Sequence, residues 1–426
     1  MRAIGVATAV LALAVLGGCG GGSDEKPTGP QKLTLQIGNL VPLTGALDPF
    51  GKSAQRSAEV AIEEIRKAAA KAGAQHTVTV QNVDYKSDPK AAVDLGNKLV
   101  KSGKTCLTGP YGSGQTARVG AKVATPGKVL QISPSASAVQ LADVKDTGYL
   151  NQLVPLDPLQ ADALAEHMSR ELKGGAKGKT VNIGALESTY GKELTKRFEE
   201  SWRNKGGSVG RKVTYKIDST IFTAPADQLA EGKPDAWVFF DFIDTYLKVA
   251  LELEKNKSAD WSPRKTFASD SLANPRLATA GPTVNNGLTG VAISAPEKGK
   301  AQKAFDAAYK RGGDATRQTF DAQEFDAVVL CYLSAVAAGS TEGEAMKDEL
   351  RAITAAPGRK YTWLELDQAI RALENGTDIN YEGVSGPIEL DADGNATAGV
   401  YDVYRFRKGK LEVTDQIPVP LGSGGV

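Results

Sequence analysis

The part of the chain most like a ligand-binding loop is residues 109–116, which read Gly-Pro-Tyr-Gly-Ser-Gly-Gln-Thr. The loop follows a short apolar run, and its glycines have the G-x-x-x-x-G spacing of a phosphate-binding loop. Gln115 stands where such a loop needs a lysine to reach the β- and γ-phosphates, so the required charge is missing. The segment therefore argues against a nucleotide site. Its glycines instead let backbone N–H groups approach some other anion.

A second hydroxyl-rich segment, residues 133–138, follows the next apolar run and reads Ser-Pro-Ser-Ala-Ser-Ala. Ser137 is placed to cap a helix, and another helix is predicted to begin near Thr116. Two helix starts side by side at one edge of a parallel sheet would suit a carboxylate. Serine and glycine are also common in such loops without any ligand, so both interpretations stay open at this point.

Patterns typical of enzymes and metal sites are missing from the sequence. No G-x-S-x-G nucleophile elbow occurs, and Asp241 with Asp244 is too little to indicate a glycosidase. His76 and His167 are the only histidines; they lie far apart with no neighbouring cysteine, which disfavours a metal site. Each is predicted to be structural or at the surface, His167 in a helix that looks solvated. We therefore expect no enzyme activity, no cofactor and no metal.

The elements that would position these loops alternate between strands and helices. Short apolar runs predict strands, and longer stretches of helix formers predict helices. Strands are expected at residues 33–37, 77–83, 105–107, 129–133, 181–186, 213–217, 236–240 and 266–268, and helices at 54–72, 89–101, 192–205, 244–257 and 320–338. This alternation predicts an α/β fold with doubly wound parallel sheets. Two late strands, at 386–390 and 401–407 around a turn at 391–394, suggest that the chain returns to an earlier sheet.

The N-terminus predicts export and lipid anchoring. Arg2 precedes an apolar run over residues 4–16, which as a helix covers about 20 Å and is too short to span a bilayer core of about 30 Å. The following Leu-Gly-Gly-Cys resembles the cleavage box of bacterial lipoproteins, which implies a signal peptide at 1–18 and a lipid on Cys19. Residues 19–31 are rich in glycine and proline and predict a flexible tether. An ordinary secretory signal with an incidental cysteine is the alternative.

The composition of the chain limits its partners, its number of domains and the state of its cysteines. Lys and Arg total 51 and Asp and Glu total 50, so no net field would hold nucleic acid or an anionic membrane surface. The 426 residues with 41% hydrophobic content suit two domains of about 150–200 residues each. Cys106 and Cys331 lie inside apolar runs, and nothing in the sequence places them near each other, so they are predicted to be buried free thiols.

Four stretches together resemble the leucine/isoleucine/valine-binding proteins, which are type I periplasmic substrate-binding subunits of ABC importers. They are residues 38–45 followed by Phe50-Gly51, residues 84–92, residues 109–116 with 132–137, and residues 381–388 with 391–394. The resemblance implies two α/β lobes joined by three hinge crossings, with the ligand held between them. Lobe 1 would contain residues 32–154 and 290–385, and lobe 2 residues 155–289 and 386–426.

The resemblance also implies roles for individual residues at the polar ends of a ligand. Ser113 and Ser137, with the backbone of Ala136, would hold the ligand carboxylate. Asp270 falls where the family has a glutamate that pairs with the α-ammonium, and it is one methylene shorter. With an acid at this position and no nearby arginine in the sequence, we expect a ligand with a cationic amine.

Aromatic residues complete the implied pocket. Phe50 would cover the ligand, and Tyr190 would contact it from the second lobe. Phe242 replaces a tyrosine, so one hydroxyl is missing. Tyr111 and Gly112 occupy positions where relatives have smaller or thiol groups, so the shape of the pocket is expected to differ.

The sequence thus predicts an exported binding protein, in the periplasm or lipid-anchored at the outer face of the cytoplasmic membrane. It is expected to be a monomer that delivers an amino acid, aliphatic or branched-chain, to an ABC permease. The alternatives are an amide, urea or aromatic acid as ligand, or a ligand sensor for a signalling receptor. An exported hydrolase is the least favoured alternative, because no nucleophile elbow is present.

Overall fold

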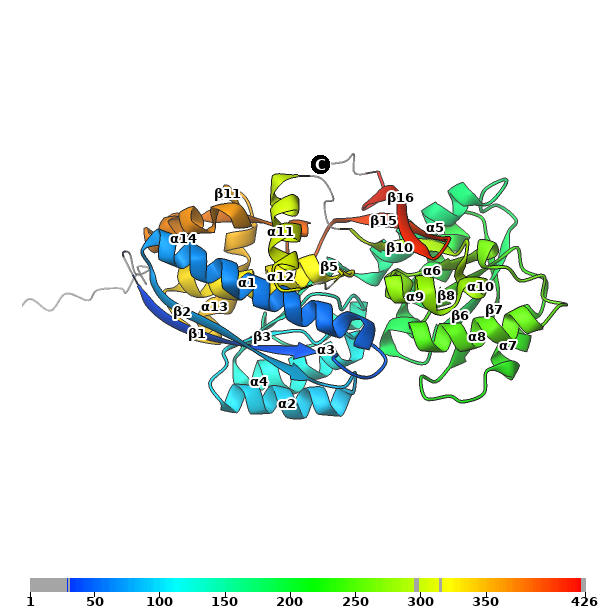
Figure 1. Cartoon of the computed structure of the whole chain (residues 1–426), viewed down its shortest axis with the longest axis horizontal. Helices are drawn as coiled ribbons and strands as arrows, with labels where there is room; N and C mark the ends of the chain where they lie inside the picture. Colours follow the sequence, from blue (N-terminus) through cyan, green and yellow to red (C-terminus); the bar gives the residue numbers. More distant parts are fainter. Residues whose placement is uncertain (1–28, 30, 295–298, 314–315, 423–426) are drawn as a thin grey trace, which may run out of the picture.

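The computed structural model describes residues 29, 31–294, 299–313 and 316–422. The predicted signal peptide and Cys19 lie outside these residues. Two α/β lobes lie side by side, and the chain passes between them more than once (Figure 1). Each lobe has its own sheet with helices on both faces, which confirms the predicted fold class.

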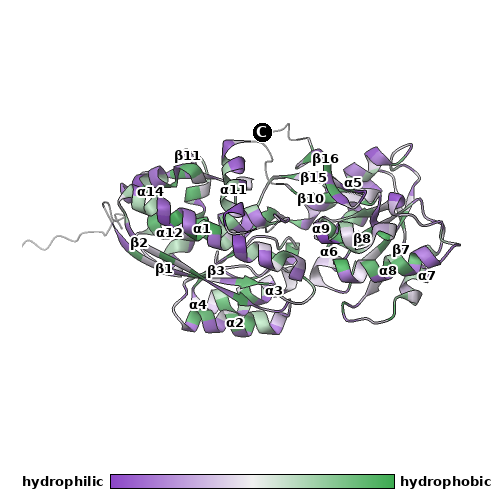
Figure 2. Ribbon diagram, viewed as in Figure 1, coloured by the Kyte–Doolittle hydropathy of each residue, from purple (hydrophilic) through white to green (hydrophobic). Residues whose placement is uncertain are grey.

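The sheet of lobe 1 is parallel and has the strand order β14-β5-β4-β3-β1-β2. Its strands are β1 (Lys32–Val41), β2 (Gln75–Asp84), β3 (Cys106–Thr108), β4 (Leu130–Ser133), β5 (Leu150–Pro155) and β14 (Asn395–Ala396). Helices α1 (Gly51–Ala72) and α12 (Asp321–Ala338) cover one face, and α2 (Pro89–Lys101) and α3 (Ser113–Val119) cover the other. Outer helices such as α2 carry both hydrophobic and hydrophilic residues, as expected for a half-buried position (Figure 2).

Lobe 1 also contains a short helix, α4, three further helices and a small second sheet. These are α4 (Thr125–Gly127), α11 (Lys300–Lys310), α13 (Gly343–Leu350) and α14 (Leu366–Glu374), with β11 (Arg359–Thr362), β12 (Ile379–Gly383) and β13 (Gly386–Pro387). Strands β11 and β12 are parallel, and β13 closes the small sheet in the antiparallel direction.

The sheet of lobe 2 has the order β16-β15-β10-β9-β8-β6-β7. Its parallel strands are β6 (Thr180–Leu186), β7 (Ser208–Tyr215), β8 (Ala236–Phe240), β9 (Thr266–Ala268) and β10 (Thr289–Ile293); β15 (Gly399–Arg407) and β16 (Lys410–Val419) are antiparallel. Helices α5 (Asp157–Glu171) and α6 (Thr189–Asn204) cover one face. The other face carries α7 (Thr223–Ala230), α8 (Ile243–Lys255), α9 (Pro275–Ala280) and α10 (Pro282–Asn285).

Two of the three points at which the chain crosses between the lobes differ from the predicted positions. Strand β10 pairs with β9 and β15 in lobe 2, so the second crossing follows Ile293 and the prediction that lobe 1 resumes at 290 is wrong. Strands β13 and β14 belong to lobe 1, so the third crossing lies between Ala396 and Gly399 and not at 385–386. The first crossing falls between Pro155, the end of β5, and Asp157, the start of α5.

The late hairpin also differs from the prediction. The chain does return to an earlier sheet, but β15 pairs with β16 through a turn at Lys408 and Gly409, not through the turn at 391–394. In that predicted turn, the Asp391 carboxylate accepts hydrogen bonds from the backbone N–H groups of Asp393 and Asn395. The turn connects the small sheet of lobe 1 to β14 and does not join two long strands.

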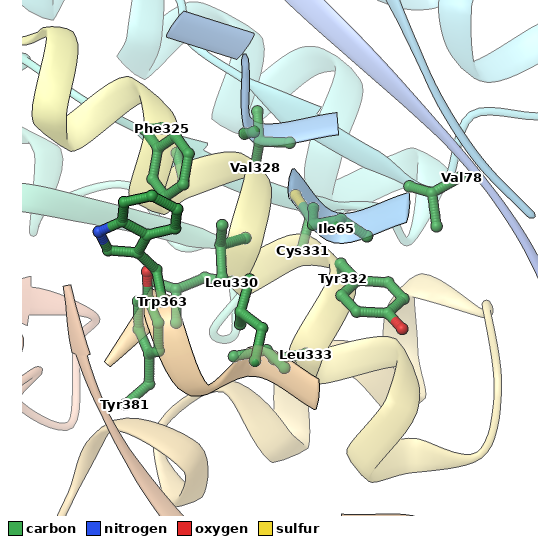
Figure 3. Packing of buried hydrophobic residues seen from close by; sticks show 14 of the residues in the cluster. Ile65, Val78, Phe325, Val328, Leu330, Cys331, Tyr332, Leu333, Trp363 and Tyr381 are labelled. Carbon is green, nitrogen blue, oxygen red and sulfur yellow. The ribbon is translucent and has the colours of Figure 1, made fainter. Parts of the chain in front are cut away.

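The core of lobe 1 is built around α12, whose side chains are almost all buried. Figure 3 shows this helix surrounded by apolar residues from α1, β2 and the small sheet. Among the described residues no single helix is long and apolar enough to cross a membrane. Helix α12 and residues Gly343–Thr354 would together be long and apolar enough for a membrane span. However, the two segments are bent relative to each other by 103°.

Helix α12 carries one half of a disulfide. Cys331 bonds to Cys106 in β3, with 6.0 Å between the two Cα atoms and a sequence separation of 225 positions. The prediction of two free thiols is therefore wrong. The pairing depends on how α12 crosses the sheet, and this packing has no local signal in the sequence.

Candidate ligand-binding site

A small cavity of about 40 Å³ lies between the lobes, next to loops that follow strands of both sheets. Such an edge is where ligands bind in α/β folds. Lobe 1 contributes Leu47, Phe50, Tyr111, Gly112, Ser113, Ser135 and Phe320, and lobe 2 contributes Tyr190, Phe242, Asp270 and Ser271. All the residues predicted to bind ligand line this cavity except Ala136 and Ser137.

The lobe 2 wall is organised around Asp270, which begins a short 3-10 turn after β9. The Tyr190 hydroxyl donates to Asp270 Oδ1 at 2.6 Å and lies 2.7 Å from the Ser269 hydroxyl. Tyr190 is held in the first turn of α6, where the Ser188 side chain caps the helix by accepting from the backbone N–H of Gly191. The Tyr190 ring stacks on Phe242 with 6.2 Å between centroids.

Asp270 is a buried acid without a basic partner. Its residue is 5% exposed, and no ion pair in the described part of the chain includes it. Burial raises the pKa of the Asp270 carboxyl, and the hydrogen bond from Tyr190 partly offsets that increase. A buried carboxylate without a basic partner is chemically suited to a ligand group that brings a positive charge and a hydrogen-bond donor.

The lobe 1 wall opposite is formed by two loops that are tied to each other. Ser113 Oγ accepts from the backbone N–H groups of Ser137 and Ala138, each at 3.4 Å. The Ser135 hydroxyl donates to the carbonyl of Tyr111 at 2.8 Å. Ser113 and Ser135 therefore lie at the cavity, while Ser137 acts behind Ser113.

The predicted helix starts in this wall are only partly correct. Helix α3 begins at Ser113 and not near Thr116. Ser137 caps no helix, because only a 3-10 turn follows and its N-cap is Ala138. The backbone N–H of Ala136 is taken up by Ser133 Oγ at 3.2 Å, so in this structure it does not face the cavity.

The phosphate-loop likeness is superficial in the structure as well. The Gln115 side chain turns back and donates to the carbonyl of Ser87 at 2.8 Å. A Cβ at Gly112 would meet Gln115 Oε1 at 2.2 Å, so a side chain there would displace the end of the Gln115 side chain.

Aromatic and aliphatic side chains form the rest of the cavity. Phe320 contacts Phe50 edge-on with centroids 5.5 Å apart, and it contacts Tyr111 at 6.3 Å. The Tyr111 hydroxyl donates to Glu324 Oε2 at 3.2 Å, and burial raises the pKa of Glu324 to about 8. Phe320 and Glu324 were not predicted as site residues, since their apolar neighbours in the sequence indicated only a core helix.

The lobes contact each other around the cavity. Arg276 Nη1 of lobe 2 lies 2.8 Å from Asp48 Oδ1 of lobe 1. The Thr319 hydroxyl donates to the carbonyl of Ala273 at 3.0 Å. The structure is therefore a closed arrangement, with side chains bridging the two lobes.

The two histidines take no part in the site. His167 Nε2 lies 2.9 Å from the Thr289 hydroxyl, and burial lowers the pKa of this imidazole to about 4. Its helix α5 is largely buried, so the prediction of a solvated helix is wrong. His76 Nδ1 lies 2.7 Å from the Tyr332 hydroxyl. Within the described ranges, no group of three His, Cys, Asp or Glu residues could hold a metal ion.

A family model described as a periplasmic binding protein matches residues 34–410. The chain belongs to the periplasmic binding protein family. The resemblance found in the sequence is thus confirmed at the level of the family.

This periplasmic binding protein has similar proteins among characterised chains and solved structures. It is 25% identical over 367 residues to the chemotactic signal transduction system substrate-binding protein BasB of Halobacterium salinarum, covering 84% of each chain. It is 24% identical over 387 residues to the Leu/Ile/Val-binding protein BraC3 of Rhizobium johnstonii, covering 88% of this chain and 93% of the other.

Its fold is similar to the crystal structure of the branched-chain amino acid transporter substrate-binding protein LivJ from Streptococcus pneumoniae in complex with isoleucine. The TM-score is 0.73 at 23% identity, and the match covers 90% of this chain and 99% of the other. This similarity confirms the type I periplasmic-binding fold.

Proposed function

We propose that this periplasmic binding protein binds an amino acid with an aliphatic side chain and delivers it to an ABC permease, without catalysis. The observation that carries the proposal is Asp270, a buried carboxylate with no basic partner in the described chain, at the wall of a small cavity between the lobes. A ligand ammonium would supply the missing charge.

The lobe 1 wall of the cavity favours an amino acid over a simple amine as the ligand. Ser113 Oγ is held by two backbone N–H groups and keeps its own proton for a ligand oxygen. Phe50, Phe320 and Phe242 supply apolar surface between the two polar ends. This combination suits a small zwitterion whose side chain makes no hydrogen bonds. The names of BraC3 and LivJ support the same class of ligand.

A thermal-shift screen over the twenty amino acids, with amides, urea and aromatic acids, tests the proposal. At a concentration 100 times its Kd, a ligand should add about 2.7 kcal/mol to the free energy of unfolding. Aliphatic amino acids are expected to give the largest shifts. Stabilisation by aromatic acids or amides alone would contradict the proposed ligand class.

We also propose that Cys19 carries a lipid that anchors the protein outside the cytoplasmic membrane, because the Leu-Gly-Gly-Cys box precedes a glycine-rich tether. Cys19→Ser is expected to move the protein from the membrane fraction to the soluble fraction. Ligand affinity should stay the same, since the site lies in the folded lobes. Fractionation followed by calorimetry measures both, and a variant that remains in the membrane pellet would refute the anchor.

A sensory role is a second candidate, favoured by the similarity to BasB, which is named as part of a chemotactic system. The same cavity and the same closure would then present a ligand-bound surface to a receptor. Uptake of labelled ligand by cells with and without the gene separates the two. Loss of uptake supports transport, and loss of chemotaxis with normal uptake supports sensing.

A further inference from the structure

A second and larger cavity, of about 460 Å³, lies between the lobes behind the ligand cavity. Lobe 2 lines it with residues of β10, β15 and β16, and lobe 1 lines it with residues of α11 and of the segment that leads into α12. Within the part of the chain that the structure describes, Phe320 is the one residue that lines both cavities. Its ring therefore forms the wall between them.

The backbone of Phe320 is held in an unusual conformation. Its φ of 77° lies in the left-handed region, which a bulky side chain rarely adopts and which needs support from neighbours. On one side, the Thr319 hydroxyl donates to the carbonyl of Ala273 in the other lobe. On the other side, the Asp321 carboxylate accepts from the backbone N–H of Gln318 at 2.7 Å. These two contacts fix the backbone that carries the ring.

The ring itself is fixed from the ligand side. It packs edge-on against Phe50 and Tyr111, both of which line the ligand cavity and not the second one. The lining of the second cavity is mixed: Ile293, Ala322 and Leu411 are apolar, whereas Asp306, Arg317 and Asp402 are charged. A ligand side chain that passed the wall would therefore find apolar surface on part of this cavity.

We propose that Phe320 sets the length of the ligand side chain that this protein accepts, because its ring closes the ligand cavity against the larger cavity behind it. This inference rests on the proposed amino-acid-binding function. A smaller residue at this position joins the two cavities. Longer side chains then gain apolar contact, and short ones lose contact with the ring.

The test compares Phe320→Ala and Phe320→Leu with the wild type. Calorimetry measures affinities for valine, leucine, norleucine, phenylalanine and 2-aminooctanoate. Each additional buried methylene is worth about fourfold in affinity. For Phe320→Ala, the ratio of 2-aminooctanoate affinity to valine affinity should rise at least tenfold, and Phe320→Leu should give a smaller rise.

Phe50→Ala is the matched control, since Phe50 borders only the ligand cavity. It enlarges this cavity without joining the two, so it should weaken all five ligands and leave the ratio near its wild-type value. Circular dichroism checks the fold of each variant. If Phe320→Ala does not fold, the affinity ratio of Phe320→Leu is the deciding measurement.

The outcomes separate this inference from the function on which it rests. An unchanged ratio in a folded Phe320 variant, with normal amino acid binding by the wild type, overturns the role of Phe320. A wild type that binds none of the twenty amino acids overturns the proposed function itself.

Discussion

Asp270→Ala is expected to weaken amino acid binding by about 30- to 5,000-fold, equivalent to about 2–5 kcal/mol. In the proposed complex the ligand ammonium loses water when the lobes close, and without the carboxylate it would remain buried and unpaired. Ser113→Ala removes one hydrogen bond to a charged group, worth about 1.5–3 kcal/mol, and should cost less because it removes a neutral hydroxyl and not a charge. Calorimetry with the ligand found in the screen measures both variants.

Asp270→Asn isolates the charge in this prediction. The asparagine oxygen can still accept from the Tyr190 hydroxyl, so the wall keeps its shape while the charge is lost. A loss close to that of Asp270→Ala shows that charge pairing dominates. Thermal unfolding of each ligand-free variant controls for damage to the fold. Unchanged affinity in Asp270→Ala would mean that the ligand has no ammonium.

The pH dependence of binding provides a second measurement on the same group. Burial raises the pKa of Asp270 in the ligand-free protein, and an ammonium binds only to the ionised carboxylate. Between this raised pKa and the pKa of the ligand ammonium, affinity should therefore be constant, and it should fall as the pH decreases through the pKa of Asp270, by up to tenfold per pH unit. The decline should begin above the ordinary aspartate value of about 3.9 and be missing in Asp270→Asn.

Removing the disulfide with Cys106→Ala and Cys331→Ala together is expected to lower the free energy of unfolding by up to about 5 kcal/mol. The large effect follows from the separation of 225 residues, because the bridge restricts a long loop in the unfolded chain. Denaturant unfolding with and without reductant measures it. The wild type should lose stability in reductant, and the double variant should not respond. Equal midpoints for the oxidised wild type and the variant would contradict the prediction.

The sequence predicted elements best where local chemistry determines them. Helix α2 has its predicted bounds because Pro89 begins it and the Asp88 carboxylate caps it by accepting from the backbone N–H of Ala91. Strand β5 was missed because Asn151 and Gln152 interrupt its apolar pattern, although both are buried. Their surroundings are supplied by distant segments, including Asn395, which accepts from the Gln152 amide.

The candidate site shows the same limit. Loop residues such as Ser113 were found because family-like motifs surround them, and the structure places them at the cavity. Phe320 was predicted as an ordinary first residue of a core helix, since neither its left-handed backbone nor its position between two cavities has a local signal. The partner of Cys106 was missed for the same reason. Contacts between segments far apart in the sequence decide all three features.

The order of strands in lobe 2 also determines when the chain can acquire its shape. Strand β15 lies between β10 and β16, and both strands of this hairpin follow every other strand of the sheet in the sequence. Lobe 1 likewise waits for β14 to complete its sheet. A chain emerging from the ribosome therefore cannot complete the sheet of lobe 1 before Ala396 has been made, or that of lobe 2 before Val419 has been made. For an exported protein, this delay keeps the polypeptide unfolded, as passage through a translocation channel requires.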